Sequence, residues 1–491
     1  MRRPPTFPRV ARRAVRRAVL RVTFVAATAG AAPGLASGVG CGPTAAAAEP
    51  LAAEGPTCRI VGHDVPQENV DACRDGLEAA APLLASTVPW RLPKGEKLVV
   101  HVYGDLDAYA AAMRTADAPE LADNWASTLY ATRESHVVLQ PRGGAALRAL
   151  TGGVPESTLW QVVHEAVHQV LARSGVAAYD LWPGWLEEGL CEDVAVRAIA
   201  ARQRPGAVPV AVDDRLHLVS DALARGRFVG LDRLLYTRVQ AFVPERVAYA
   251  HAFSFVRFLA ADPARFRALL ERAAAVPPPP PGRRAARQVV FEKAFAALLV
   301  EAYGPLAPLE ARWRAAVAAT RPAWFEPTRS AQWLPDGRLL QASYPQSSAQ
   351  TIATAPVPAG GYVVTGAFRV LAAGDGGQAD LIVGYAQRDD ARFVKLALGA
   401  SGYVTLLAFA AGTWQERYRV SAEVPPATFA VGTDVRFALT VAGGRLQLDV
   451  GGRRVFDAEA PPGFDVAAGA WGVGAWDGAV VWTDLEAGPR R

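Results

Sequence analysis

The stretch WQVVHEAVHQVLARSG, which runs from Trp160 to Gly175, decides the fold of the central part of this chain. Its apolar residues recur every three or four positions, so it predicts an α-helix with one apolar face. His164 and His168 lie four residues apart and therefore project from the same face of that helix, with Glu165 beside them. Two imidazoles one turn apart can bind one metal ion, so this HExxH spacing indicates a metal site.

A second helix is expected downstream, where Pro183 opens the segment PGWLEEGLCEDVA. Glu188 follows His168 by twenty residues and would face back toward the first helix, and Glu187 is the alternative carboxylate. One carboxylate and two imidazoles are a typical set of zinc ligands that leaves a fourth position for water. The sequence therefore predicts one Zn²⁺ ion bound by His164, His168 and Glu188.

The HExxH motif followed by WLEEG resembles the gluzincin metallopeptidases, in particular the bacterial peptidase-MA-like group, over roughly residues 95–320. This resemblance implies a mainly helical α+β catalytic domain with a small β-sheet. It also implies that Glu165 is the general base that takes a proton from a zinc-activated water attacking a peptide carbonyl. Glu192 matches the acid that orients a ligating histidine, with Asp193 as the alternative.

The residue that would stabilise the oxyanion in such a reaction is left open by the sequence. Tyr249 and His251 lie on a helix expected downstream, and Tyr130 and His136 lie on an expected hairpin upstream. A tyrosine O–H or a histidine N–H could donate to the oxyanion. Each of these residues is an ordinary packing or surface residue in the alternative interpretation.

The four cysteines are Cys41, Cys58, Cys73 and Cys191. Cys58 and Cys73 flank a short polar segment and are expected to form a disulfide in an oxidising compartment. Cys191 lies three residues after Glu188, where its thiolate could bind the metal ion, although a small buried side chain is the commoner role of such a residue.

The start of the chain is typical of an export signal. An arginine-rich region precedes an uncharged stretch that ends at Cys41, and RRAVLR (16–21) resembles a twin-arginine signal. Residues 1–41 are therefore interpreted as a signal, with secretion and lipid anchoring at Cys41 both open. Membrane contact is expected only through this signal or anchor, and the protein is expected outside the cytoplasm.

The positive net charge comes from this same region. Residues 1–21 hold eight of the 52 basic residues, so 44 remain against 47 acidic residues, a net charge of −3. A mature chain with this balance lacks the basic surface that nucleic-acid binding requires. We therefore expect no nucleic-acid partner.

Composition and spacing also predict the layout of the region before residue 322. Residues 42–56 are rich in Ala, Pro and Glu and are interpreted as a flexible tether, and residues 57–321 as the metallopeptidase domain. A strand is expected at 97–104, and a hairpin at 128–142. Ser157 is expected to cap the HExxH helix, which Gly175 would end.

Residues 322–491 change character and predict an all-β sandwich. Short β-rich runs are separated by glycines, and AGG joins two alternating runs as a tight hairpin. This region resembles the concanavalin-A-like jelly rolls, including laminin-G-like modules. That resemblance implies a glycan-binding or cell-surface-binding role, and core packing is the alternative role for its aromatic residues, which are Trp414, Tyr418, Trp471, Trp476 and Trp482.

Two functions follow from these observations. The first is a secreted or surface-tethered zinc metallopeptidase that acts on a peptide or protein substrate. The second is a non-catalytic extracytoplasmic binding protein, in which a metallopeptidase-like scaffold carries a sandwich that binds glycan or protein. Retention of Glu165 favours the first, because a scaffold without turnover has no use for a general base.

Overall fold

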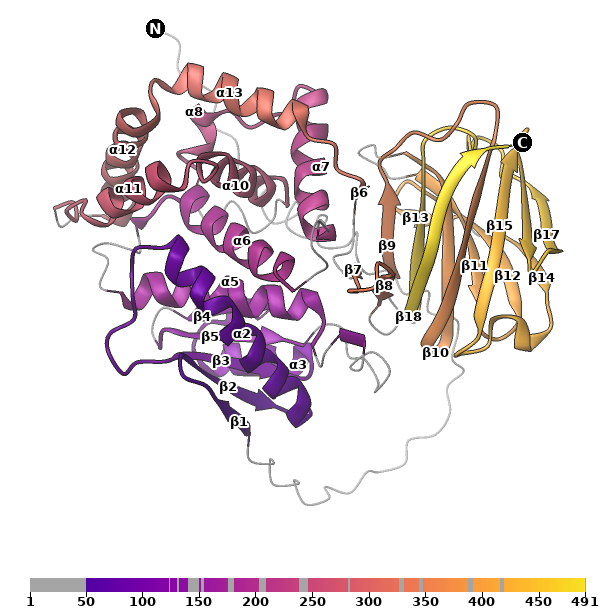
Figure 1. The fold of residues 1–491 in the computed structure, drawn as a ribbon, viewed down its shortest axis with the longest axis horizontal. Coiled ribbons are helices and arrows are strands. Elements are labelled where there is room, and N and C mark those ends of the chain that lie inside the picture. The colour runs from indigo at the N-terminus through magenta and orange to yellow at the C-terminus, as the bar shows by residue number, and fades with distance from the viewer. Residues whose placement is uncertain are drawn as a thin grey trace, which may run out of the picture.

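The protein has a mainly helical N-terminal region and a C-terminal antiparallel β-sandwich (Figure 1). The structure is a computed structural model, and it describes residues 50–122, 124–129, 132–139, 150–151, 154–174, 181–202, 209–237, 246–280, 283–325, 331–343, 348–386, 392–415 and 419–490. The expected export signal and Cys41 lie outside the described residues. Among the helices of the described residues, none is long and apolar enough to cross a bilayer.

A five-stranded sheet with the order β1-β2-β3-β5-β4 forms the base of the N-terminal region. Its strands are β1 (Leu51–Glu54), β2 (Cys58–His63), β3 (Leu98–Tyr103), β4 (Ala126–Leu129) and β5 (Glu134–Val138). β2, β3 and β5 are parallel, whereas β4 pairs antiparallel with β5 at one edge. The predicted strand and hairpin are therefore confirmed.

The tether prediction is wrong for residues 51–54. These residues form β1, which pairs antiparallel with β2, and Ala53 is buried in the core between the sheet and the helices. Alanine-rich composition suggested a flexible segment, but an alanine is small enough to be packed at a sheet edge.

Helix α5 (Glu156–Arg173) lies across the sheet, and α6 (Gly184–Ala200) packs on α5. Both helices begin just after a proline, and Pro155 rather than Ser157 is the N-cap residue of α5. The backbone N–H of Glu156 instead donates to Oε1 of Gln332, at 2.8 Å, so a residue from the C-terminal region satisfies the first turn of α5.

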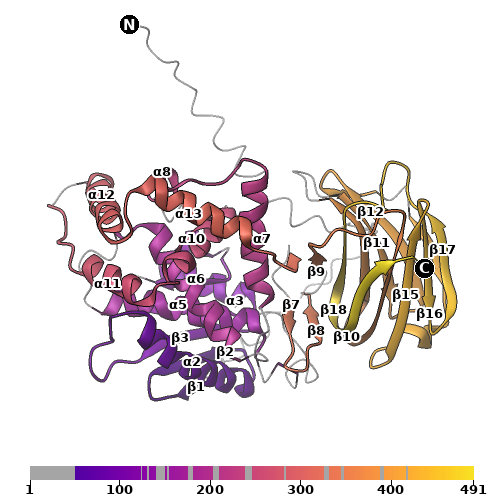
Figure 2. The same ribbon diagram turned by 45° about the horizontal axis from the view of Figure 1, so that its top comes forward.

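Most of the remaining helices pack around this pair (Figure 2). The exception is α3 (Leu106–Thr115), which packs on the opposite face of the sheet and is followed by the 3₁₀ turn η1 (Pro119–Leu121). The others are α2 (Gln67–Thr87), α7 (Val210–Ala224), α8 (Leu231–Leu234), α10 (Arg246–Leu259), α11 (Pro263–Ala274), α12 (Arg284–Tyr303) and α13 (Leu306–Ala319). α10 packs closely on α6, so α6 is enclosed between α5 and α10.

Two long strands, β10 (Tyr362–Ala386) and β18 (Ala470–Pro489), organise the sandwich. The first half of β10 pairs with β15 and the second half with β11, while β18 follows it along its whole length. Each long strand therefore belongs to both layers. The shorter elements are β6 (Trp324–Phe325), β7 (Ala331–Trp333), β8 (Leu339–Ala342), β9 (Ser348–Ala353), β11 (Arg392–Gly399), β12 (Tyr403–Ala410), β13 (Thr413–Trp414), β14 (Val420–Glu423), η4 (Pro426–Phe429), β15 (Asp434–Ala442), β16 (Arg445–Val450) and β17 (Arg453–Glu459).

The predicted tight hairpin joins β15 to β16. Gly443 and Gly444 form its turn with φ values of 55° and 74°. Two consecutive positive φ angles are those of a type I′ turn, which glycine adopts without steric cost. The sequence pattern thus identified both the strands and the turn residues.

The two regions are joined through α7. Oδ2 of Asp213 accepts hydrogen bonds from the backbone N–H groups of Ala323 and Trp324, at 3.0 and 3.3 Å. The imidazole of His217 packs on the ring of Phe325, with centroids 4.7 Å apart. α7 therefore fixes the strand with which the chain enters the sandwich.

The predicted Cys58–Cys73 disulfide is not formed. Both cysteines are buried free thiols, and Sγ of Cys58 lies 3.2 Å from Oε1 of Glu78. α2 runs back along β2, which places Arg74 and Glu78, one and five residues beyond Cys73, opposite Cys58. The spacing of the two cysteines along the sequence did not reveal that Cys58 lies opposite Arg74 and Glu78 rather than opposite Cys73.

Candidate metal centre

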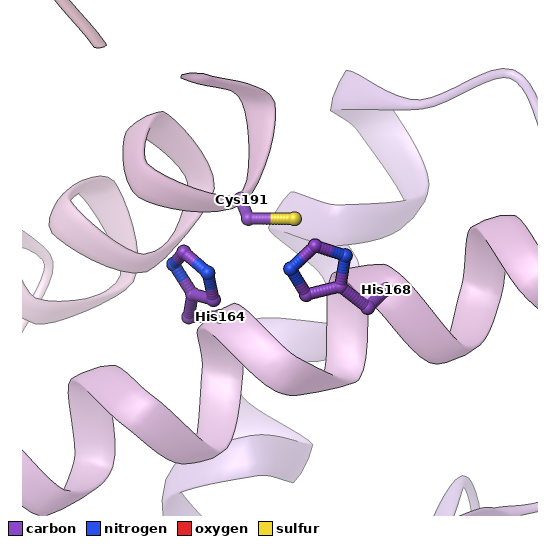
Figure 3. A group of neighbouring side chains, drawn as sticks. All are labelled: His164, His168 and Cys191. Atoms are coloured by element: carbon purple, nitrogen blue, oxygen red, sulfur yellow. The ribbon is translucent and has the colours of Figure 1, made fainter. Parts of the chain in front are cut away.

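The packing of α6 on α5 brings three metal-binding side chains together. His164 and His168 rise from the same side of α5, and Cys191 faces them from α6 (Figure 3). One nitrogen of each histidine and the sulfur of Cys191 all lie within 4.8 Å of one another. Cys191 is fully buried, and the two imidazoles are nearly so.

Glu188 joins the same cluster. Its Oε2 lies 3.3 Å from Nε2 of His164 and 3.8 Å from Nε2 of His168. Zinc binds nitrogen and oxygen at about 2.0–2.2 Å in tetrahedral geometry, which places neighbouring ligand atoms about 3.4 Å apart. The two distances lie on either side of that value, so the Glu188 carboxylate lies at ligand spacing from both imidazoles.

Two further carboxylates lie behind the histidines. Oε1 of Glu187 is 3.0 Å from Nδ1 of His168, and Oε1 of Glu192 is 3.8 Å from Nδ1 of His164. A proton on each Nδ1 would leave each Nε2 lone pair facing Glu188. The geometry therefore makes Glu187 the hydrogen-bonding partner of His168, whereas Glu192 lies beyond hydrogen-bonding distance of His164.

The cluster is electrostatically coupled. Burial by itself would lower the pKa of His168, but the Cys191 thiol, Glu187 and Glu188 raise it well above its ordinary value. Burial raises the pKa of the Cys191 thiol to about 12, against the opposing effect of His168. A bound cation would favour the thiolate, since it supplies positive charge at the point where the thiol is desolvated.

Glu165 contacts the sheet. Its Oε2 accepts a 2.7 Å hydrogen bond from the hydroxyl of Thr128, on the edge strand β4. Its backbone carbonyl lies 3.2 Å from the hydroxyls of Thr128 and Ser135. Glu165 is therefore a buried carboxylate, held at the sheet and next in sequence to His164.

A buried ion network supports the far side of the centre. Arg215, on α7, is 1% exposed and contacts Oε2 of Glu192 and Oδ2 of Asp214, at 3.0 and 2.9 Å. Its guanidinium also lies 4.8 Å from the centroid of Trp160. Asp193, the alternative to Glu192, pairs with Arg197 instead and does not approach either histidine of the cluster within ion-pair distance.

The structure removes His251 from the list of oxyanion donors. Its Nε2 accepts from the backbone N–H of Val229, at 3.1 Å, so its proton is on Nδ1, which lies 2.7 Å from the carbonyl of Val247. No N–H is left for a substrate. Burial also lowers the pKa of this imidazole to about 4, so it stays neutral near pH 7.

The other donor candidates have different positions. His136 lies on the face of β5 opposite Ser135, where its Nδ1 hydrogen-bonds Tyr103, at 2.8 Å, so it belongs to the outer face of the sheet. Tyr249 is half-buried on α10 and packs against the main core. Tyr130 lies outside the described residues.

Two residues of the centre were missed or undervalued by sequence reasoning. Cys191 was visible as a neighbour of Glu188 one helical turn on, but nothing in the sequence distinguished a ligand from a small core residue. Thr128 carries no motif, and only strand pairing brings it to Glu165.

The sandwich contains a second group of polar and aromatic side chains. Nζ of Lys395, on β11, lies 3.0 Å from Oδ2 of Asp380, on β10, and both residues are almost completely buried. The ammonium lies 4.8 Å from the ring centroid of Trp414 and 5.6 Å from that of Trp476. Burial raises the pKa of Asp380, while Lys395 opposes that shift.

The aromatic residues named from the sequence separate into two groups. Trp471 and Trp482 are buried in the sandwich core, as the packing alternative predicts. Trp414 and Trp476 are half-buried beside Lys395. Tyr418 lies outside the described residues.

One family model matches the chain, over residues 158–278, and its description is "Protein of unknown function (DUF1570)". The match includes most of α5, all of α6 and every residue of the metal cluster. It covers about a quarter of the chain and gives no indication of peptidase activity. No curated protein matches the sequence significantly.

Solved structures with a similar fold include three β-sandwich proteins. The carbohydrate-binding module CBM66 from Bacillus subtilis is 14% identical, with a TM-score of 0.28, and the match covers 34% of this chain and 96% of the module. Sheep galectin-11 is 13% identical, with a TM-score of 0.23 and coverage of 30% and 95%. A Bacillus subtilis protein of unknown function with a galectin-like fold is 13% identical, with a TM-score of 0.27 and coverage of 33% and 88%.

Proposed function

We propose that the helical region is a zinc-dependent hydrolase that acts on peptide bonds. The observation that carries this proposal is the position of Glu188 Oε2, 3.3 and 3.8 Å from the Nε2 atoms of His164 and His168. The two helices thus present two imidazoles and one carboxylate at zinc-ligand spacing. A bound zinc ion would supply the Lewis acid that lowers the pKa of a water molecule and polarises a carbonyl group.

The residues of the chain supply positioning and proton transfer. Thr128 holds the Glu165 carboxylate through its hydroxyl, which leaves Oε1 free of that bond to accept a proton from the attacking water. Glu187 fixes the orientation of His168. Because Thr128 lies on β4, a change at the edge of the sheet would also move the base.

Replacement of Glu165 by Gln tests the hydrolase proposal. The amide keeps the shape and can still accept from Thr128, but it cannot take a proton. We expect the full-length Glu165→Gln protein to retain zinc and to lose at least about a hundredfold in hydrolysis of a peptide library. The matched control is Glu271→Gln, at an exposed ion pair with Arg267 on α11, which should change neither property. Equal hydrolysis by the Glu165→Gln and parent proteins would refute the assignment.

A second candidate function belongs to the sandwich. The Lys395–Asp380 pair flanked by Trp414 and Trp476 supports the binding of a polar, ring-shaped ligand such as a glycan, because aromatic faces stack on sugar rings and fixed charges orient hydroxyls. The similar solved structures include a carbohydrate-binding module and a galectin. The comparisons thus bear on this candidate rather than on peptide hydrolysis.

A glycan-array experiment tests this candidate. We expect the intact protein to bind a subset of glycans and the Trp476→Ala variant to lose that binding. The Trp125→Ala variant, which removes an exposed tryptophan of the helical region, is the control and should bind as the parent does. Absence of glycan binding by the parent would leave the sandwich without a supported ligand class.

A further inference from the structure

The fully buried thiol of Cys191 adds a fourth donor to the centre. Cys191 comes one helical turn after Glu188, and both side chains leave α6 toward α5. The sulfur and one nitrogen each of His164 and His168 lie within 4.8 Å of one another. An ion placed between these three atoms would therefore lie within about 2.8 Å of each of them, whereas metal–ligand bonds are about 2.0–2.3 Å long. A movement of well under 1 Å per side chain would bring these three donors to bonding distance of one ion.

Burial of Cys191 alone is the ordinary state of a small core residue. Its neighbours are not ordinary core residues, however, because it contacts an imidazole that is itself hydrogen-bonded to Glu187. A thiolate is a better zinc ligand than water and would balance the charge of the ion in a site closed to solvent. The arrangement thus places a sulfur atom beside the two imidazoles. A thiolate bound to the ion would take the coordination position that an open catalytic site leaves to water.

We propose that Cys191 is a protein ligand of the metal ion, so that His164, His168, Glu188 and Cys191 form a closed four-ligand site. This inference rests on the proposed metal-dependent function and refines it. Four protein ligands complete a tetrahedral zinc ion and are typical of structural sites, whereas hydrolytic sites keep one position open. Hydrolysis then requires release of Cys191 from the ion, and the resting protein is latent.

Cobalt substitution tests this inference on the full-length chain. Co²⁺ occupies zinc sites, and a thiolate bound to it gives a charge-transfer band in the near-ultraviolet that nitrogen and oxygen ligands do not give. We expect one Co²⁺ per chain with this band in the parent protein. In Cys191→Ser the band should disappear, and the affinity for the ion should fall by more than the roughly 10- to 100-fold expected for a change behind the ligands.

Cys73→Ser is the matched control, because Cys73 is also a fully buried free thiol of the helical region. It should keep both the band and the affinity. Binding of Co²⁺ without the band in the parent would overturn the role of Cys191 and leave the three-ligand centre intact. Failure of the parent to bind Co²⁺ would instead overturn the proposed metal-dependent function itself.

Zinc X-ray absorption of the parent protein provides a measurement that does not depend on folding of the serine variant. A sulfur atom about 2.3 Å from the zinc ion would support the inference, and a first shell made only of nitrogen and oxygen at about 2.0–2.2 Å would overturn it. Peptide hydrolysis by Cys191→Ser gives a functional readout. We expect this variant to hydrolyse peptides faster than the parent, because water would replace the thiolate on the ion. A slower rate with zinc still bound would contradict a closed resting site.

Discussion

Glu187 and His168 form a hydrogen bond of 3.0 Å between Oε1 and Nδ1, across the interface of α6 and α5. This bond places the Nε2 lone pair of His168 on the side of Glu188. Glu187 therefore decides which nitrogen of His168 is available to a metal ion, although it is not itself placed among the ligands.

Glu187→Gln tests this role. The amide can still accept from Nδ1–H but carries no charge, so the imidazole becomes a poorer ligand. We expect zinc affinity to fall by about 10- to 100-fold, measured by competition with a chromogenic chelator. The folded state should be preserved, which circular dichroism would check, and an unchanged affinity would show that His168 is oriented by packing alone.

Arg215 is predicted to be essential for stability. It is fully enclosed with Glu192 and Asp214, and replacing it by Met removes the guanidinium that pairs with both buried carboxylates. Such losses cost about 3–5 kcal/mol in free energy of unfolding, measured by denaturant titration. Arg225→Met, at the C-cap of the same helix, is the control. Arg225 forms a partly exposed ion pair with Asp221, so its loss should cost below about 1 kcal/mol. Similar values for the two variants would contradict the argument.

Gly189 allows α10 to lie against α6. A Cβ at this position would be 2.5 Å from the carbonyl oxygen of Ala252 and 2.6 Å from Cγ2 of Val256, so the two helices would have to separate. We expect Gly189→Ala to lower the free energy of unfolding by about 1–3 kcal/mol. Because Gly189 is adjacent to Glu188, zinc affinity should fall as well. Gly488→Ala, where an added Cβ meets nothing within 4 Å, is the control and should be near neutral.

Asp213 is predicted to make the junction between the two regions depend on pH. Burial raises the pKa of its carboxyl to about 6, although the N–H groups of Ala323 and Trp324 oppose that shift. Between about pH 4 and pH 6 the carboxyl is therefore protonated in the folded protein and ionised in the unfolded chain. This group thus favours the folded state at low pH, and its contribution to the free energy of unfolding is lost as the pH rises from about 4 to about 6.

Asp213→Asn removes the charge and keeps an oxygen that can accept the same two hydrogen bonds. We expect the variant to be at least as stable as the parent at pH 8. Its advantage in stability over the parent should shrink as the pH falls from 8 to 5, and thermal unfolding of both proteins across that range measures it. Asp213→Ala removes the acceptor and should be destabilising by about 1–3 kcal/mol. An advantage of Asp213→Asn that grows as the pH falls would contradict the raised pKa.

The local pattern of the sequence predicted much of this architecture. Helical spacing identified α5 with His164 and His168 on one face, and alternation with glycines identified β15, β16 and their turn. These features depend on backbone geometry over a few residues, and that information is contained in the segment itself. The choice of Glu188 over Glu187 for the metal position was also made from the sequence and stays a prediction. In the structure Glu188 lies nearer the Nε2 atoms of both histidines, and Glu187 hydrogen-bonds Nδ1 of His168.

Contacts between distant segments decided the rest. The packing of helices and strands decides whether Cys58 meets Cys73, whether His251 has a free N–H and which hydroxyl holds Glu165. A local sequence pattern does not encode how one element is positioned against another. The clearest case is Cys191. The sequence determined that it follows Glu188 by one turn, but only the close packing of α6 between α5 and α10 turned its sulfur toward two imidazoles, because side-chain neighbours in a core are fixed by the shapes of all the elements around them.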